Sequence, residues 1–191
     1  MTNNLKTYIL TGGKSSRFGE DKLNFLFNGK PILQYVIDSV SPFSEEIVLV
    51  GNSEEFTAFN SRIISDSPIF SGPISGIHSI FTDNQYSDKL IIAGDMPFLE
   101  NNELKFYLET AAHISKILIP KTEEDFGHNL HVLIKKEWTA DLLEILSQNP
   151  EMRSVHRLWE KFGMEFFKVS EDRKNHYWNV NERKDLMTTD D

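Results

Sequence analysis

The chain alternates short apolar runs with longer amphipathic segments along most of its length. Short apolar runs predict seven β-strands of four or five residues each, at positions 7–11, 47–50, 62–65, 89–93, 116–119, 131–135 and 166–169. Amphipathic segments predict helices that begin near Pro31, Glu54, Ser75, Asn102, Trp138, Met152 and Asn181. Alternating strands and helices are typical of βαβ units. The pattern therefore predicts an α/β protein with three layers, α/β/α, in which a Rossmann-like, mainly parallel sheet of about seven strands carries helices on both faces.

Composition limits the kind of protein this can be. Its 191 residues suit a single domain spanning positions 1–191. It carries 20 Lys and Arg against 29 Asp and Glu, a net charge of −9, which argues against broad electrostatic binding to nucleic acid or to an anionic membrane. It has no cysteine, which excludes disulfides, thiolate metal sites and cysteine nucleophiles. We see neither a secretory signal nor the ~20 apolar residues that a membrane helix needs, and we expect a soluble, cytoplasmic protein.

The first predicted strand leads into a glycine turn followed by three basic side chains, Lys14, Arg17 and Lys22. Glycine lets the main chain approach an anion closely, and the N-terminus of a following helix would add partial positive charge. The run therefore indicates a phosphate cradle. Taken alone, a plain strand-to-helix connection with solvated basic side chains explains it about as well.

Two common phosphate-binding loops do not match this run. A Walker A loop needs a glycine where the chain has Tyr8, and the dinucleotide loop G-x-G-x-x-G fails because Lys14 follows the paired Gly12 and Gly13. The turn thus indicates a nucleotide-binding loop of another class.

Glycine and polar residues follow the first four predicted strands directly. In an open α/β sheet, ligands bind beyond the carboxyl ends of the strands, so these positions are candidates for a binding site. Asp95 is the strongest metal-ligand candidate, because Mg²⁺ prefers oxygen ligands and often takes one or two carboxylates together with phosphate and water. A turn or N-cap aspartate is an equally common reason for such a position. The residues after the four strands are Thr11, Gly12 and Gly13, then Gly51 and Asn52, then Asp66, then Gly94 and Asp95.

Segments spread over nearly the whole chain resemble one family. Leu10-Thr11-Gly12-Gly13, Ser16-Arg17-Phe18-Gly19 and Asp21-Lys22 are similar to the loop L-[AT]-G-G-x-S-x-R-M-G-x-D-K of the molybdenum cofactor guanylyltransferases, with Phe18 in place of methionine. The segment 94–98 resembles the family's G-D-x-P-[FL] element, and 72–77 its G-P-[LI]-x-G-[LI] stretch. The segment 179–186 resembles its closing N-[IV]-N-[TE]-x-x-D-L.

The resemblance implies transfer of GMP from GTP to Mo-molybdopterin with release of pyrophosphate, and Mg²⁺, or Mn²⁺ in its place, as metal cofactor. It implies that the N-terminal half binds nucleotide and the C-terminal half binds the acceptor. The implied catalytic residues are Arg17, Lys22 and Asp95, with Asp95 as metal ligand. The implied nucleotide-binding residues are Leu10, Thr11, Gly12, Gly13, Lys22, Asn52, Asp66, Pro73, Gly76 and Asp95, and the implied acceptor-binding residues are Arg153, Arg157 and Asn181. Transient contact with molybdopterin-delivering and molybdoenzyme-maturation proteins would accompany such a role.

Two other functions stay open on sequence alone. A cytidylyl or sugar-phosphate nucleotidyltransferase would share a looser form of the loop, although the Gly12-Gly13 pair favours the guanylyl branch. A non-catalytic GTP-binding protein that delivers cofactor has less need of Lys22, Asp66 and Asp95 together. The preferred base distinguishes guanylyl from cytidylyl transfer, and pyrophosphate release distinguishes an enzyme from a non-catalytic binding protein.

Several of these residues also have plain structural interpretations. Asn181 suits a helix N-cap. Asp21 and Lys22 could form a surface ion pair of little energetic weight. The acidic positions 123–125, followed by His128 and His131, are more typical of a solvated charged loop than of a metal site.

Overall fold

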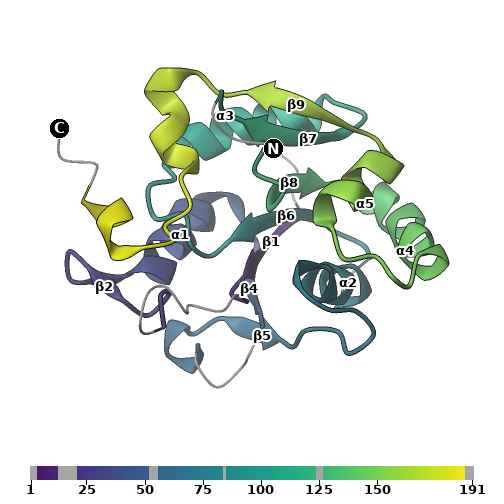
Figure 1. Ribbon diagram of the computed structural model, residues 1–191, viewed down its shortest axis with the longest axis horizontal. Helices are drawn as coiled ribbons and strands as arrows, with labels where there is room; N and C mark the ends of the chain where they lie inside the picture. The colour runs from purple at the N-terminus through teal and green to yellow at the C-terminus, as the bar shows by residue number, and fades with distance from the viewer. Residues whose placement is uncertain (1–3, 13–20, 52–55, 84, 124–126, 188–191) are drawn as a thin grey trace.

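The computed structural model describes residues 4–12, 21–51, 56–83, 85–123 and 127–187. Its centre is a five-stranded sheet in the order β5-β4-β1-β6-β8 (Figure 1). Strands β1 (Leu5–Leu10), β4 (Glu46–Val50), β5 (Arg62–Ile64) and β6 (Asp88–Ala93) are parallel, and β8 (His131–Ile134) is antiparallel to β6. The carboxyl ends of the four parallel strands therefore share one edge of the sheet.

The remaining strands lie outside the central sheet. β7 (Ile117–Lys121) pairs in parallel with β9 (Met164–Lys168), and β2 (Leu26–Phe27) forms a small antiparallel pair with β3 (Lys30–Pro31). All seven predicted strands thus exist, but the prediction that about seven belong to one sheet is wrong, since five do.

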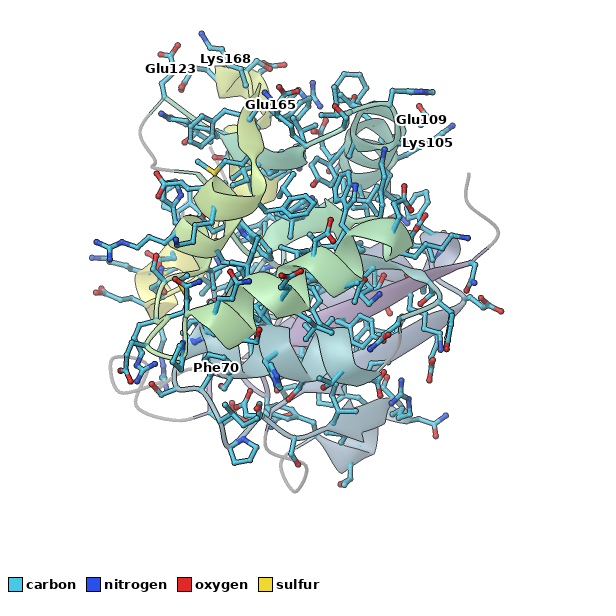
Figure 2. All side chains as sticks on the ribbon, turned by 90° about the vertical axis from the view of Figure 1, so that its right-hand side faces the viewer. Phe70, Lys105, Glu109, Glu123, Glu165 and Lys168 are labelled. Atoms are coloured by element: carbon cyan, nitrogen blue, oxygen red, sulfur yellow. The ribbon has the colours of Figure 1, made fainter. Side chains whose placement is uncertain are left out.

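Part of the reason why β7 is not hydrogen-bonded into the central sheet lies in its own sequence. Pro120 lies within β7 and has no N–H to donate to a neighbouring strand, which makes the strand a poor interior member of a larger sheet. Charged side chains gather at the outer end of this pair, where Lys168 Nζ lies 3.2 Å from Glu123 Oε1 (Figure 2). The two strands therefore pair with each other, although Leu118 and Ile119 of β7 belong to the same two buried clusters that cover the central sheet.

Helices cover both faces of the central sheet, which confirms the predicted three layers (Figure 1). One buried cluster joins Ile9 and Leu90 of the sheet to α1 (Ile32–Val40) and α3 (Asn101–Ala112). The other joins Tyr8 and Ile91 to α2 (Pro73–Asp83), α4 (Thr139–Gln148) and α5 (Val155–Phe162). Within the described residues, no helix is both long and apolar enough to cross a membrane.

Not every predicted helix start can be matched to the structure. The helix expected near Glu54 would begin outside the described residues. The helix expected near Met152 begins at Val155, because Ser154 Oγ accepts a hydrogen bond from the Arg157 N–H and caps it. Short 3₁₀ helices occupy Ser41–Phe43, Thr57–Phe59, Lys136–Trp138, Glu171–Tyr177 and Arg183–Leu186.

The N-cap predicted at Asn181 is wrong. The last 3₁₀ helix is capped by Glu182, whose side chain accepts from the backbone of Asp185 while its own N–H donates to Asp185 Oδ2 at 2.8 Å. This reciprocal capping box satisfies the start of the helix. Asn181 is thereby left one residue outside the helix, with its side chain exposed.

Lys89 is a fully buried charge-bearing residue in β6. Its Nζ donates to the Ser87 carbonyl at 2.9 Å and to Thr139 Oγ1 at 3.1 Å, and burial lowers its pKa to about 8. The folded state then binds fewer protons than the unfolded state between about pH 8 and the unfolded pKa of about 10.4, so this group makes stability rise with pH over that window. We expect Lys89→Met to remove about 1 to 2 kcal/mol of that rise between pH 7 and 9.5, measured by urea unfolding.

An equal pH dependence in the wild type and in Lys89→Met would contradict the buried, lowered pKa. Lys6→Met, at a partly exposed lysine on the neighbouring β1, serves as the control, because its side chain remains in contact with water.

Candidate active site

Asp95 lies just beyond the end of β6, at the carboxyl edge of the sheet. Gly94 joins it to the strand and donates its N–H to the Leu10 carbonyl at 3.0 Å, which holds the tips of β6 and β1 together. A side chain at position 94 would come within 3.2 Å of that same oxygen and 3.3 Å of Leu23 and Leu33, so the close approach depends on glycine. The sequence-predicted position of Asp95 at a strand tip is confirmed.

Both oxygens of the Asp95 carboxylate accept hydrogen bonds. Lys22 Nζ lies 2.6 Å from Oδ2, and Asn179 Nδ2 lies 2.5 Å from Oδ1. The Lys22 and Asp95 side chains are only 16% and 19% exposed, so solvent screens this ion pair less than an ordinary surface pair. Three residues that are far apart in the sequence thus meet at one carboxylate.

Lys22 reaches Asp95 from a turn that Asp21 organises. Asp21 Oδ1 accepts from the Leu23 N–H at 3.1 Å, and its other oxygen accepts from the Asn24 amide. A short acidic side chain that bonds to the following backbone is a typical turn device. Asp21 therefore shapes the loop, and the surface ion pair considered for Asp21 and Lys22 does not occur, since Lys22 pairs with Asp95 instead.

Asn179 was not among the predicted site residues, although the prediction placed Asn181 there from the same motif. Backbone contacts bring Asn179 to Asp95, because the Val180 N–H donates to the Asp95 carbonyl at 2.8 Å. Asn181 instead donates its amide to the Asn179 carbonyl at 3.2 Å. The motif N-x-N carried the signal, but it did not tell which asparagine faces the carboxylate.

A bidentate ion pair anchors the segment that delivers Asn179 (yellow in Figure 1). Arg173 Nε and Nη2 lie 2.7 and 2.6 Å from the two oxygens of Glu103 on α3, and the guanidinium stacks 4.7 Å from the centroid of the Phe106 ring. Such fork geometry restricts orientation as well as distance. Nearer the site, His176 Nδ1 lies 3.0 Å from the Phe98 carbonyl. The segment is therefore held at two points just before Tyr177.

Asp66 occupies the same edge of the sheet, after β5. An added side chain at Gly76 would lie 3.2 Å from Asp66 Oδ1 and 2.4 Å from Leu10 Cδ2, and one at Gly12 would lie 3.9 Å from Asp66 Oδ2. The carboxylate of Asp66 thus lies close to both glycines, and it is exposed to solvent. Four of the predicted nucleotide-binding residues, Leu10, Gly12, Asp66 and Gly76, are brought together here.

We expect Gly76→Ala to weaken nucleotide binding and to destabilise the fold by about 1–3 kcal/mol, because the new methyl group overlaps Leu10 and displaces Asp66. The measurement is GTP titration by calorimetry together with thermal unfolding. Thr82→Ala, at an exposed position on the same helix, is the matched control. Unchanged affinity and stability in Gly76→Ala would show that this contact has no role.

Thr11 and Gly51 close the adjoining strand ends. The Thr11 N–H and Oγ1 both bond to the Val50 carbonyl at 2.9 Å. Gly51 has a positive φ of +147°, and a side chain there would lie 2.5 Å from Thr11 Oγ1, so this position requires glycine. The predicted residues Gly13, Arg17 and Asn52 lie outside the described residues.

Two hollows flank Asn179. One of about 510 Å³ has Pro73, His128, Arg153, His156 and Asn179 among its lining residues. The other, of about 250 Å³, is lined by Thr122, His128, Lys174, Tyr177, Trp178, Asn179 and Asn181. Asn179 and His128 belong to both.

The predicted acceptor-binding residues fall at different places. Arg153 lines the larger hollow and Asn181 the smaller one. Arg157 is exposed on α5, and among the described residues that line the two hollows it does not appear. Arg153 and Asn181 therefore line different hollows, each of which Asn179 also lines.

His131 begins β8, as the strand predicted at positions 131–135 implies. It is fully buried between the rings of Tyr107, at 4.6 Å, and Tyr177, at 5.2 Å, and desolvation lowers its pKa to about 3. It pairs in register with Ile92 of β6, so the sheet buries it. The ring is consequently neutral at physiological pH. Positions 124–126 lie outside the described residues.

The Asp95 carboxylate is suited to bind a Mg²⁺ ion whose other ligands are phosphate oxygens and water. Among the described residues, no three His, Cys, Asp or Glu side chains gather closely enough to enclose an ion. Each carboxylate oxygen has two lone pairs, so Asp95 can accept from Lys22 and Asn179 and still offer an oxygen to a cation. This donor set fits Mg²⁺ that completes its shell with phosphate oxygens and water, and does not fit a metal enclosed by protein.

Known proteins resemble this chain in sequence and in fold. A model of the MobA-like NTP transferase domain matches residues 7–162. A Thermococcus kodakarensis protein described as a probable molybdenum cofactor guanylyltransferase is 32% identical over 186 residues, covering 93% of this chain and 90% of its own. The solved structure of molybdopterin-guanine dinucleotide biosynthesis protein A from Archaeoglobus fulgidus is 26% identical over 95% of both chains, with a TM-score of 0.73.

A more remote structure has the same fold. The 4-diphosphocytidyl-2C-methyl-D-erythritol synthase of Anaerococcus prevotii is 13% identical, with a TM-score of 0.71 over 96% of this chain and 95% of its own. This likeness concerns the fold alone. The family match spans most of the chain, from the first strand through α5, and includes Lys22, Asp66 and Asp95. The chain belongs to the MobA-like NTP transferase family.

Proposed function

We propose that this protein transfers GMP from GTP to Mo-molybdopterin, forming molybdopterin guanine dinucleotide and releasing pyrophosphate. The observation that carries the proposal is the contact of Lys22 and Asn179 with Asp95 at the edge of the sheet, beside a hollow of about 510 Å³. Family membership and the Thermococcus kodakarensis relative described as a guanylyltransferase support the choice of nucleotide and acceptor.

The proposed reaction is an in-line displacement at phosphorus. An oxygen of the acceptor phosphate forms a bond to the α-phosphorus of GTP, and the bond from that phosphorus to the bridging oxygen of the β-phosphate breaks. The electron pair leaves with pyrophosphate. Both reactants are anions, so the protein contributes mainly positioning and charge stabilisation, without a covalent enzyme intermediate.

The described residues have distinct proposed roles in this displacement. Lys22 stabilises the negative charge that develops around the α-phosphoryl group, and Asp66 contacts the nucleotide beside Gly76. Asp95 would hold Mg²⁺, which when bound supplies Lewis-acid stabilisation of the phosphate oxygens. The backbone at Thr11 and Gly12, continuing into Gly13, and the side chain of Arg17 are proposed to bind the β- and γ-phosphates.

The acceptor is proposed to enter from the side of Asn179. Arg153 lines the larger hollow and could bind its phosphate, while Asn181 and the half-exposed Trp178 line the smaller one. Arg157 lies apart on α5 and would have to contribute from outside the hollows. The two halves of the chain, proposed to bind nucleotide and acceptor, meet at the Asn179 to Asp95 bond.

Thermal unfolding with GTP, CTP and ATP, each with and without Mg²⁺, tests the nucleotide assignment. A nucleotide at ~100 times its dissociation constant stabilises the native state by about 2.7 kcal/mol. We expect a Mg²⁺-dependent rise in melting temperature with GTP and much smaller changes with the other two. A preference for CTP would move the protein to the cytidylyl reading and overturn the guanylyl assignment.

Pyrophosphate release tests whether the bound nucleotide is turned over. With GTP, Mg²⁺ and Mo-molybdopterin present, we expect pyrophosphate to form in step with consumption of GTP. Binding of GTP without any pyrophosphate would favour the non-catalytic delivery protein.

A further inference from the structure

His128 lines both hollows and contacts Asn179, which in turn contacts Asp95. Its Nδ1 is 3.4 Å from Asn179 Oδ1, and its ring packs 5.8 Å from the ring of Tyr177. The backbone fixes its place, because its N–H donates to the Pro120 carbonyl at 2.8 Å and its carbonyl accepts from the His131 N–H at 3.0 Å. The imidazole is therefore held against the Asn179 amide from the side opposite Asp95.

The chemistry of the two neighbours determines how the Asn179 amide is oriented. An ionised carboxylate only accepts hydrogen bonds, so the amide NH₂ must face Asp95 and the amide oxygen must face His128. An amide oxygen only accepts in turn, so the Nδ1 of His128 must carry the proton. Amide orientation and histidine tautomer are thus linked in one chain of contacts from His128 to Asp95.

We propose that His128 is a positioning residue: its Nδ1–H holds the Asn179 amide with the NH₂ toward Asp95 and so fixes the carboxylate that pairs with Lys22. A rotated amide would place its oxygen against the carboxylate, and the two would repel. Asp95 would then lose one of the two contacts that orient it. The catalytic consequence rests on the proposed function, whereas the tautomer and the amide orientation do not.

Nitrogen NMR of the ¹⁵N-labelled wild-type protein tests the geometry without any assay of turnover. The neutral form of His128 is expected to show a protonated Nδ1. An unprotonated Nδ1 in the folded protein would overturn the proposal, whatever reaction the protein performs. The result also holds if every variant at this position should fail to fold, because it uses the wild-type chain.

Two substitutions at position 128, with side chains of similar shape, then distinguish hydrogen-bond donation by this residue from its packing contacts. Asparagine at position 128 offers an amide N–H near the place of Nδ1, whereas leucine has nearly the same shape and no donor. We expect His128→Leu to lower kcat roughly 10-fold with little change in the KM for GTP, and His128→Asn to recover most of that loss. His113→Leu, at an exposed histidine beyond α3, is the control.

The outcomes distinguish this proposal from the proposed function. Equal kcat losses in His128→Leu and His128→Asn would assign the residue a packing role and overturn the inference, while guanylyl transfer by the wild type still stood. If the wild type released no pyrophosphate from GTP, the proposed function would fail, and the Nδ1 measurement would still judge the inference alone.

Discussion

An Asp95→Ala variant is expected to release pyrophosphate from GTP at least about 100-fold more slowly than the wild type. The substitution removes the carboxylate to which Lys22 and Asn179 both bond, at 2.6 and 2.5 Å. It also removes the side chain proposed to hold Mg²⁺. Because a stabiliser of transition-state charge acts mainly on the chemical step, the loss should appear in kcat more than in the KM for GTP.

A comparison with another aspartate makes the Asp95 experiment specific. Asp38 on α1 forms an ion pair with Lys30 of β3 at 2.7 Å, but that pair is exposed, and Asp38→Ala should leave turnover unchanged. Thermal unfolding of both variants checks that they fold. Normal Mg²⁺-dependent turnover in Asp95→Ala would sink the assignment of Asp95 as the metal ligand.

The edge of the sheet where the site lies could be predicted from local patterns. Strand-forming runs followed by glycine and acidic residues placed Asp66 and Asp95 at strand ends, and the parallel arrangement put both on one side of the molecule. That inference needs only the short apolar runs typical of buried strands and the rule that ligands bind beyond the carboxyl ends of parallel strands. It worked because each strand end is determined by residues close to it in sequence.

Long-range pairings could not be predicted in this way. β7 and β9 each read clearly as strands, but nothing local shows that they pair with each other instead of joining the central sheet. Asn179 and Asp95 are likewise 84 positions apart. The partner of a side chain depends on where the whole chain returns, which short-range periodicity does not encode.

The N-cap expected at Asn181 failed for a more local reason. Asparagine before a helix is a common cap, yet Glu182 and Asp185 form a reciprocal capping box one residue later. The Glu182 side chain accepts from the Asp185 N–H, and Asp185 Oδ2 accepts from the N–H groups of Asn181 and Glu182. With the cap supplied elsewhere, Asn179 is the asparagine that meets Asp95, and Val180 fixes it there through its backbone N–H.

Lys22→Met is the second substitution for which we expect a large effect, a fall in turnover of about 100-fold. Methionine keeps much of the apolar stem of lysine and removes the charge, so losses from packing are small. Lys22 Nζ lies 2.6 Å from Asp95 Oδ2 and therefore competes with any cation for that carboxylate. The lysine should therefore weaken metal binding until a nucleotide brings its own phosphates.

Metal binding to the nucleotide-free protein tests this competition without an acceptor. Mn²⁺ titration followed by electron paramagnetic resonance should show tighter binding to Lys22→Met than to the wild type, because the variant leaves the Asp95 carboxylate uncompensated. Lys30→Met, at an exposed ion pair with Asp38, should bind Mn²⁺ as the wild type does. If Lys22→Met turned over more slowly but bound Mn²⁺ no more tightly, Lys22 would act on the phosphate alone and would not compete with the metal. If neither turnover nor Mn²⁺ binding changed, Lys22 would have no role in the site.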